Sequence, residues 1–268
     1  MYPTEMPRLD APIVLVHGLC GYDRLTAFGR TLKRYFPGIC EQLEAAGNRV
    51  LVPRLSRTRG VAARAEELKR FIEARVPDGP VHLIGHSMGG LDSRYLVSKL
   101  GMASRVRSLT TVGTPHRGTA FADWGVRFLR RAAPLFGLFG VSQEAFFDLT
   151  TAACRQFNAE VPDVTGVRYF SVAGVCEGPW VGAEWQLPHR IVRAAEGPND
   201  GVVSVASAAW GESADVWDGD HLNLVNWPNR KARLRGVWES FAPDYGRIVR
   251  RVRQTEEINP QIHADERR

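Results

Sequence analysis

The sequence predicts an α/β fold with a mostly parallel central sheet and helices on both faces. Short, continuous apolar segments recur along the chain, which is typical of strands buried on both faces. Segments with helical apolar spacing lie between them, and this alternation favours parallel strands joined by helices. The composition, 44% hydrophobic and 24% charged among 268 residues, excludes a disordered chain and a coiled coil. Because no linker or internal repeat divides the chain, we expect one domain over residues 1–268.

The apolar segments and the helical spacing define the expected elements. The expected strands are Pro12–Val16, Arg49–Leu55, Val81–Ile84, Val106–Val112, Tyr169–Val175 and the shorter Ala214–Trp217. The expected helices are Leu25–Leu43, Val61–Val76 and Met88–Leu100. In the second of these helices, Ala65, Leu68 and Ile72 share the face that would pack on the sheet.

One segment interrupts the alternation of strands and helices. Between Gly118 and Asn158 no strand is evident, and the chain is instead helix-like and rich in aromatic residues. Residues 119–150 are therefore either a helical excursion packed on the core or a lid over an apolar pocket. The large apolar residues that such a lid would carry are Phe128, Leu129, Leu135, Phe136, Leu138 and Phe139.

The charged residues exclude some classes of partner. The net charge is +6, but 31 of the 35 basic residues are arginines scattered along the chain. Because nucleic-acid binding needs a basic stripe or a recognition motif, we expect no nucleic-acid partner. The apolar stretches are far shorter than the ~20 residues of a membrane-spanning helix, so we expect no transmembrane segment.

The N-terminus and the cysteines bear on the compartment of the protein. The first ten residues contain two prolines and no apolar core of a signal peptide. We therefore expect a cytoplasmic protein, or a secreted one whose signal has been removed. Four cysteines stand far apart, without the spacing of a zinc site, and the sequence leaves their pairing open.

The strongest chemical signal is the segment Gly85–Gly90, which contains the pattern G-x-S-x-G. It follows an expected strand and precedes an expected helix. A sharp strand-to-helix turn forces its central residue, Ser87, into strained backbone angles and lifts Oγ clear of the sheet. The turn also places Oγ at the positive N-terminus of the helix. The context therefore predicts that Ser87 is a nucleophile.

A serine nucleophile needs a base to take its proton, and His221 is the best candidate. In hydrolases with this turn, the order along the chain is serine, acid, histidine, which excludes histidines before the serine. His116 follows the serine too closely, and His263 lies in a charged tail. Of the two that remain, His189 follows no clear strand, whereas His221 lies in a polar loop after one.

The carboxylate that orients the histidine should lie between Ser87 and His221. Asp200 fits, because it lies in a turn before the apolar Val202 and Val203. Three other candidates lie too near His221 for the chain to fold back, and we interpret them as solvated loop charges: Asp215, Asp218 and Asp220. The oxyanion hole needs two backbone N–H groups. Met88, after the serine, and Leu19, in a glycine-containing loop after the first strand, are expected to supply them.

At these residues the chain resembles the bacterial triacylglycerol lipases of the α/β-hydrolase superfamily. The resemblance extends in order from the first strand to the histidine loop. Its motifs are Val16–Leu19, Gly85–Gly90, Gly113–Gly118, Arg155–Ala159, Asn199–Val203 and Asp220–Asn223. It implies the α/β-hydrolase fold, the triad Ser87, Asp200 and His221, and the oxyanion hole of Leu19 and Met88. It also implies a mobile helical lid within residues 119–150.

The resemblance is incomplete at two positions. Secreted members of the family bind a structural Ca²⁺ with an aspartate two residues after the catalytic histidine. Here that position is Asn223, a weaker ligand, and only Glu177 and Glu184 lie near the position of the second acidic ligand. Because Asn223 is a weak calcium ligand, we expect no metal and no cofactor. At the second position, Ala206 stands where those lipases often carry a disulfide cysteine.

These residues together predict a serine carboxylic-ester hydrolase. The expected activity is that of a triacylglycerol lipase on medium- to long-chain acyl esters. The partners would then be a lipid or small ester substrate and, transiently, a lipid interface. The alternatives are a short-chain carboxylesterase, a thioesterase or an acyltransferase, because the same triad serves all of them. A non-catalytic lipid-binding protein on the same fold is a further alternative, although no triad residue is missing.

Overall fold

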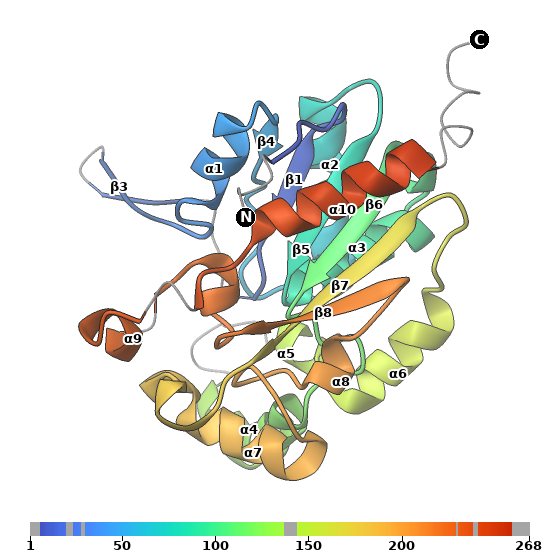
Figure 1. The fold of residues 1–268 in the computed structure, drawn as a ribbon. Coiled ribbons are helices and arrows are strands. Elements are labelled where there is room, and N and C mark those ends of the chain that lie inside the picture. Colours follow the sequence, from blue (N-terminus) through green and yellow to red (C-terminus); the bar gives the residue numbers. More distant parts are fainter. Residues whose placement is uncertain are drawn as a thin grey trace.

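The structure is a computed structural model, and it describes residues 6–19, 24–27, 30–136, 144–228, 230–237 and 241–258. Its centre is a six-stranded sheet in the order β4-β1-β5-β6-β7-β8, in which every neighbouring pair is parallel (Figure 1). The strands are β1 (Ile13–Val16), β4 (Val50–Leu51), β5 (Val81–His86), β6 (Val106–Val112), β7 (Arg168–Val175) and β8 (Ser213–Asp218). The predicted parallel sheet is thereby confirmed.

Helices cover both faces of the sheet, as predicted. One face carries α1 (Ile39–Ala45) and α10 (Tyr245–Ile258), and the other carries α2 (Val61–Arg75) and α3 (Met88–Lys99). In Figure 1, α10 crosses in front of the strands while α2 and α3 lie behind them. The charged C-terminal segment that forms α10 was not among the expected helices.

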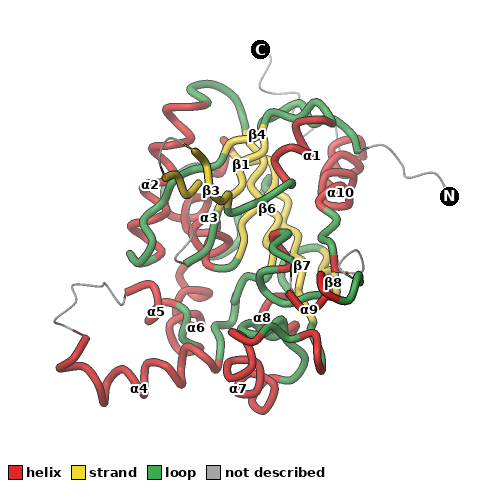
Figure 2. Tube along the Cα trace, turned by 90° about the vertical axis from the view of Figure 1, so that its left-hand side faces the viewer, coloured by secondary structure: helices red, strands yellow, loops and turns green. Residues whose placement is uncertain are grey.

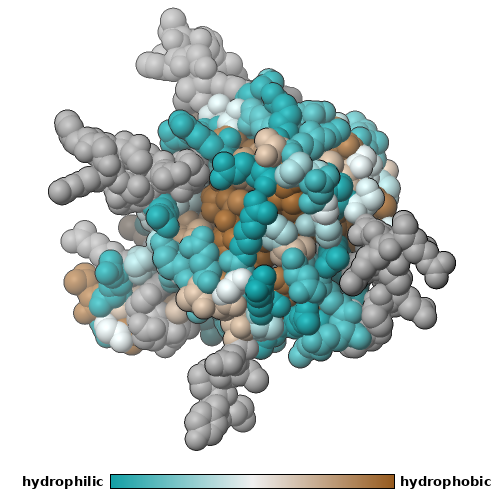
Figure 3. All heavy atoms as spheres, turned by 90° about the horizontal axis from the view of Figure 1, so that it is seen from above, coloured by the Kyte–Doolittle hydropathy of each residue, from teal (hydrophilic) through white to brown (hydrophobic). Residues whose placement is uncertain are grey.

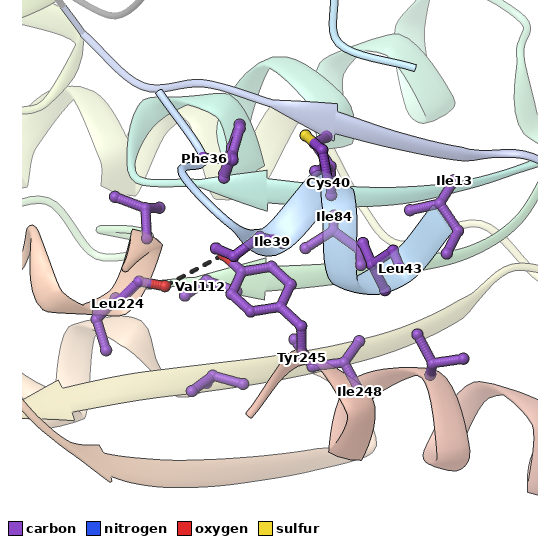
Figure 4. Close-up of a cluster of buried hydrophobic side chains, with 14 of the residues drawn as sticks. Ile13, Phe36, Ile39, Cys40, Leu43, Ile84, Val112, Leu224, Tyr245 and Ile248 are labelled. Carbon is purple, nitrogen blue, oxygen red and sulfur yellow. Dashed lines mark hydrogen bonds between the residues drawn. The ribbon is translucent and has the colours of Figure 1, made fainter. Parts of the chain in front are cut away.

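The side chains of β1 show how one strand serves two cores. Ile13 and Leu15 join the cluster under α1 and α10, and Val14 and Val16 join the cluster under α2 and α3. This division follows from the alternation of side chains along a strand. Figure 4 shows the first cluster, in which Tyr245 of α10 donates its hydroxyl to the Leu224 carbonyl at 3.1 Å.

The expected helix Leu25–Leu43 is wrong over most of its length. The backbone forms an antiparallel hairpin, β2 (Arg24–Ala27) and β3 (Arg30–Arg34), and becomes helical only in α1. Pro37 disfavours helical angles in the residue before it. Gly38 then adopts a left-handed φ of 76° immediately before α1. The two residues divide the segment, and the apolar spacing alone gave no sign of this.

The strand β4 is shorter than its apolar segment. Only Val50 and Leu51 pair with β1, whereas the expected strand ran from Arg49 to Leu55. Pro53 lacks a backbone N–H and cannot continue a strand ladder, which accounts for the early end.

The remaining helices gather at the carboxyl ends of the strands, away from α1 and β4 (Figures 1 and 2). They are α4 (Ala120–Phe136), α5 (Glu144–Asp148), α6 (Thr151–Glu160), α7 (Gln186–Glu196), α8 (Val205–Ala208) and α9 (Arg230–Leu234). Short 3₁₀ segments lie at Ala103–Arg105, Gly178–Trp180, Ala183–Trp185 and Asn223–Val225. The interruption predicted after Gly118 is thus helical, as α4, α5 and α6. In the part of the chain that the structure describes, no helix is long and apolar enough to cross a membrane.

The end of the molecule that carries α1 and β4 lies opposite the carboxyl ends of the strands. Seen from the side of α1 and β4, its described surface is mostly hydrophilic, with hydrophobic side chains visible in the middle (Figure 3). A hollow of about 220 Å³ lies at this side, lined by Phe36, Val50 and Phe71 with Arg34 and Arg75. None of the predicted site residues lines it.

Candidate active site

Ser87 lies between the last residue of β5 and the first residue of α3, at the turn that the sequence predicts. Its backbone has φ 55° and ψ −129°, which are angles that residues other than glycine rarely adopt. Among the described residues other than glycine, only Ser87 and Asn226 have a positive φ. The Ser87 N–H donates to the Val112 carbonyl at the end of β6, at 2.9 Å. The strained turn is therefore held by the sheet itself.

The glycine two residues after Ser87 allows the turn to approach β1. A Cβ atom on Gly89 would lie 2.5 Å from the Val16 carbonyl oxygen. Such a contact is with backbone, which has little room to move away. Only glycine therefore allows α3 to begin this close to the sheet.

Asp200 and His221 form the pair that chain order predicts. The Asp200 Oδ2 and His221 Nδ1 atoms are 2.7 Å apart. A carboxylate only accepts, so Nδ1 carries the imidazole proton and Nε2 remains an acceptor. Asp200 is fully buried, and its Oδ1 accepts the N–H groups of Val202 and Val203 at 3.0 and 2.8 Å. The His221 N–H also donates to the Asp200 carbonyl at 2.7 Å, so two bonds fix the pair.

The competing aspartates have other partners. Asp215 forms ion pairs with Arg247 and Arg251 of α10, at 3.1 and 2.7 Å. Asp220 is buried, and its Oδ1 accepts the N–H groups of Leu222 and Asn223. The interpretation of these two residues as solvated loop charges is wrong.

Asp218 is exposed to solvent as interpreted, but it is the last residue of β8 and not a loop residue. The competing histidines are also engaged elsewhere. His189 lies on α7 and contacts the Cys176 carbonyl through Nε2 at 2.9 Å. His116 is buried between Arg94 and Thr111. His263 lies outside the described residues.

The loop after β1, expected to supply an oxyanion donor, lies against the nucleophile. A Cβ atom on Gly18 would lie 2.7 Å from the Ser87 Cβ, so the loop backbone reaches the serine only because residue 18 is glycine. Leu19 lines the same cavity as Ser87, and Met88 is fully buried at the start of α3.

A buried ion pair that sequence reasoning missed anchors this loop. Arg64 of α2 donates to the His17 carbonyl at 2.7 Å and to Asp92 Oδ2 at 2.8 Å, and both charged side chains are fully buried. Burial raises the pKa of Asp92 to about 7, an effect that the neighbouring Arg64 opposes. Arg64 lies three residues after Val61 and four before Leu68, on the buried face of α2, so an arginine on the apolar face of the expected helix was the signal that could have found it.

An apolar cavity of about 380 Å³ opens at these residues. Ser87 and His221 both line it, which brings the two predicted reacting side chains to one space. Most of the other lining residues are apolar or aromatic and come from α4, α5 and the loops at the carboxyl ends of the strands. They include Leu19, Tyr35, Pro115, Phe121, Ala122, Phe146, Leu149, Trp185, Val202, Val203, Leu222 and Trp227.

Asn223, which stands where secreted members of the family have an acidic calcium ligand, has both ends of its amide engaged within its own loop. Asn223 Oδ1 accepts the Asp220 N–H at 2.8 Å, and its Nδ2 donates to the Trp227 carbonyl at 2.9 Å. Glu177 is paired with Arg193. Within the described ranges, no group of three or more His, Cys, Asp or Glu side chains gathers to hold a metal ion. Asn223 instead closes its own turn by hydrogen bonds.

Comparison with known proteins agrees with this geometry. Residues 11–160 match the alpha/beta hydrolase fold family. Triacylglycerol lipase 2 of Saccharomyces cerevisiae is 33% identical to this chain over 86% of this chain and 83% of its own length. The chain belongs to the α/β-hydrolase family. The order of the site agrees with membership, since Ser87 follows β5, Asp200 follows β7 and His221 follows β8.

Solved structures show the same fold. The Staphylococcus hyicus lipase matches this α/β hydrolase with a TM-score of 0.69 and 17% identity, over 96% of this chain and 100% of that chain. A metagenomic carboxyl esterase matches with a TM-score of 0.71 and 21% identity, over 96% and 77%.

The cysteines are free thiols where the structure describes them. Cys40, Cys154 and Cys176 are buried and unpaired, and Cys20 lies outside the described residues. Burial raises the pKa of the Cys154 and Cys176 thiols to about 12, so neither is a reactive nucleophile.

Proposed function

We propose that this α/β hydrolase is a lipase that cleaves carboxylic esters through Ser87, Asp200 and His221. The observation that carries the proposal is the Asp200–His221 hydrogen bond at the edge of an apolar cavity that Ser87 also lines. An apolar cavity beside a serine nucleophile fits an acyl chain. The relatedness to triacylglycerol lipases supports the same activity.

The proposed mechanism assigns one role to each residue. His221 Nε2 takes the Ser87 proton as Oγ attacks the ester carbonyl, and Asp200 holds the imidazole tautomer and stabilises the imidazolium. The N–H groups of Leu19 and Met88 stabilise the tetrahedral oxyanion. His221 then protonates the departing alcohol, and water repeats the cycle on the acyl-enzyme. No cofactor is needed for any step.

The aromatic side chains of α4 extend from this cavity towards solvent. Phe121 lines the cavity, Trp124 stacks on it at 6.0 Å between ring centroids, and Phe128 stacks on Trp124 at 5.7 Å. Phe128 is 55% exposed, and Phe147 of α5 is 38% exposed. Exposed rings beside an apolar cavity favour contact with a lipid surface. We therefore propose α4 and α5 as the lid; the side chains of Leu129, Leu135, Phe136, Leu138 and Phe139 lie outside those described.

The test of the catalytic assignment is covalent labelling. A fluorophosphonate probe phosphonylates an activated serine, with loss of fluoride, so it should label the wild-type protein once, at Ser87. Ser87→Ala is the matched control and should remove both the label and ester hydrolysis. A folded protein that takes no label would instead favour a non-catalytic lipid-binding function.

A further inference from the structure

The residue before the nucleophile, His86, lies between two parts of the proposed active site. It is the last residue of β5 and is 1% exposed. Its Nε2 is 3.0 Å from the His221 carbonyl oxygen, and its Nδ1 is 2.8 Å from the Tyr35 hydroxyl. Its ring centroid lies 4.5 Å from that of His221. The proposed mechanism uses neither His86 nor Tyr35.

The chemistry of the partners fixes where each proton lies. A carbonyl oxygen only accepts, so His86 Nε2 carries a hydrogen and donates it to His221. Burial, together with the nearby His221, holds the pKa of His86 well below its ordinary value, so the ring is neutral and Nδ1 is an acceptor. The Tyr35 hydroxyl therefore donates to His86 Nδ1.

The same Tyr35 oxygen accepts the Gly18 N–H at 3.2 Å. Gly18 directly precedes Leu19, the proposed oxyanion donor. The four groups thus form one directed chain: the Gly18 N–H donates to Tyr35, Tyr35 donates to His86, and His86 donates to the His221 carbonyl. The Tyr35 backbone is fixed as well, since its carbonyl accepts the indole N–H of Trp227 at 2.9 Å.

We propose that Tyr35 and His86 are positioning residues that hold the oxyanion loop and the catalytic histidine in fixed relation to Ser87, through this chain of hydrogen bonds. The inference rests on the proposed function. One end of the chain lies next to an oxyanion donor and the other end is the backbone of the base. Movement at either end changes the alignment of the transition state rather than the fit of the substrate, so the effect falls on kcat.

The test compares variants that remove hydrogen bonds of this chain and keep an aromatic ring at each position. Tyr35→Phe removes the hydroxyl and keeps the ring. His86→Phe keeps an aromatic ring and removes both the Nε2 donor and the Nδ1 acceptor. Tyr169→Phe is the matched control, because the Tyr169 hydroxyl also accepts a backbone N–H, that of Val164, at 3.0 Å. Tyr169 is equally buried but lies at the start of β7, at the opposite end of the strand from the site.

We expect Tyr35→Phe and His86→Phe each to lower kcat about tenfold with KM within twofold of wild type. The double variant should lose little more than either single variant, because one break already interrupts the chain. Tyr169→Phe should lower the melting temperature to a similar extent and leave kcat unchanged. Three results would overturn the proposal: Tyr35→Phe retaining more than half of kcat, Tyr35→Phe raising KM alone, or Tyr169→Phe lowering kcat as much.

The fluorophosphonate label separates this proposal from the proposed function. If the wild-type protein takes no label at Ser87, the catalytic assignment itself fails. If the wild-type protein is labelled and Tyr35→Phe is labelled at the same rate, the assignment of Ser87 stands and only the positioning role fails.

Discussion

Ser87 combines the proposed chemistry with unfavourable backbone angles. Residues other than glycine held in such sparsely populated regions lose about 1–3 kcal/mol of stability. Ser87→Ala keeps the strain, whereas Ser87→Gly relieves it, because glycine adopts φ 55° freely. We expect Ser87→Gly to unfold at a higher urea concentration than Ser87→Ala, by about 1 kcal/mol or more in the free energy of unfolding. Equal unfolding curves would mean that the turn is not strained.

Asp200 and Asp215 have different partners, so substitutions at the two positions should affect different properties of the protein. Asp200→Asn keeps the size of the side chain but favours the wrong tautomer of His221, so kcat should fall by about 10²- to 10⁴-fold. Asp215→Asn breaks the ion pairs to Arg247 and Arg251 and should change only stability, by about 1 kcal/mol. Hydrolysis of a p-nitrophenyl ester and thermal unfolding measure the two effects. A larger loss of activity in Asp215→Asn would show that the acid has been misassigned.

At the scale of elements, we expect α4 and α5, the proposed lid, to determine which esters are preferred. Their exposed rings, Trp124, Phe128 and Phe147, lie beside the apolar cavity, where an acyl chain and a lipid surface would meet them. Burying this surface is favourable at roughly 25 cal/mol per Å². We expect p-nitrophenyl esters of medium- and long-chain acids to react faster than the acetate, with a rise in rate when substrate forms micelles.

Phe128→Ser tests the same element, because it shortens the exposed aromatic row without touching the cavity. It should reduce the rise on micelles and leave the rate on soluble esters unchanged. Asp78→Ser, at an exposed residue that precedes β5, is the surface control. Fastest hydrolysis of the acetate, with no response to micelles, would favour the short-chain esterase.

The loop from Asp220 to Trp227 is the element in which the family resemblance places an acidic calcium ligand, at the position of Asn223. Asn223 bridges it with both ends of its amide. We expect EDTA to change neither activity nor melting temperature. A bound calcium ion at a hundredfold excess over its Kd would instead add about 2.7 kcal/mol of stability. Asn223→Ala should lower the melting temperature, because the buried Asp220 N–H and the half-buried Trp227 carbonyl each lose a hydrogen bond. A fall in melting temperature with EDTA that Ca²⁺ reverses would contradict this account.

At the scale of the whole molecule, buried histidines make stability depend on pH. Burial holds the pKa values of His86 and His116 well below the ordinary value of 6.5. Below pH 6.5 the unfolded chain binds protons at these positions and the folded protein does not, so stability falls as the pH falls. Each histidine contributes a slope approaching about 1.4 kcal/mol per pH unit.

Urea unfolding between pH 7.5 and 5 measures this slope. His116→Gln removes one of the two titrating groups. It should reduce the pH dependence of the free energy of unfolding by the contribution of one histidine, whatever its effect on stability at pH 7.5. An unchanged slope would show that His116 is protonated in the folded protein.

The sequence determined the sheet and the three proposed reacting residues. Strand order along the chain, the turn at Ser87, and the loops of Asp200 and His221 are all set by short-range features: apolar runs, glycines and turn residues. Because such features act over a few residues, they can be recognised in the sequence without knowledge of the tertiary structure. The hairpin β2–β3 was misread because its apolar spacing also fits a helix, and the opposing signal, Pro37 with Gly38, lies beyond its end.

Only the tertiary structure decided which distant residues support the site. Tyr35 forms a hydrogen bond with His86, which is 51 residues away in the sequence, and Arg64 forms one with the His17 carbonyl, 47 residues away. Neither contact can be predicted from a local sequence pattern. Each pair of residues is brought together only by the order of the parallel strands in the sheet and by the packing of the elements around them. An arginine on a helix normally faces water, and a tyrosine normally packs with its hydroxyl at a surface. Here both side chains are buried. Because buried polar atoms need hydrogen-bond partners, Arg64 and Tyr35 each bind a part of the proposed active site.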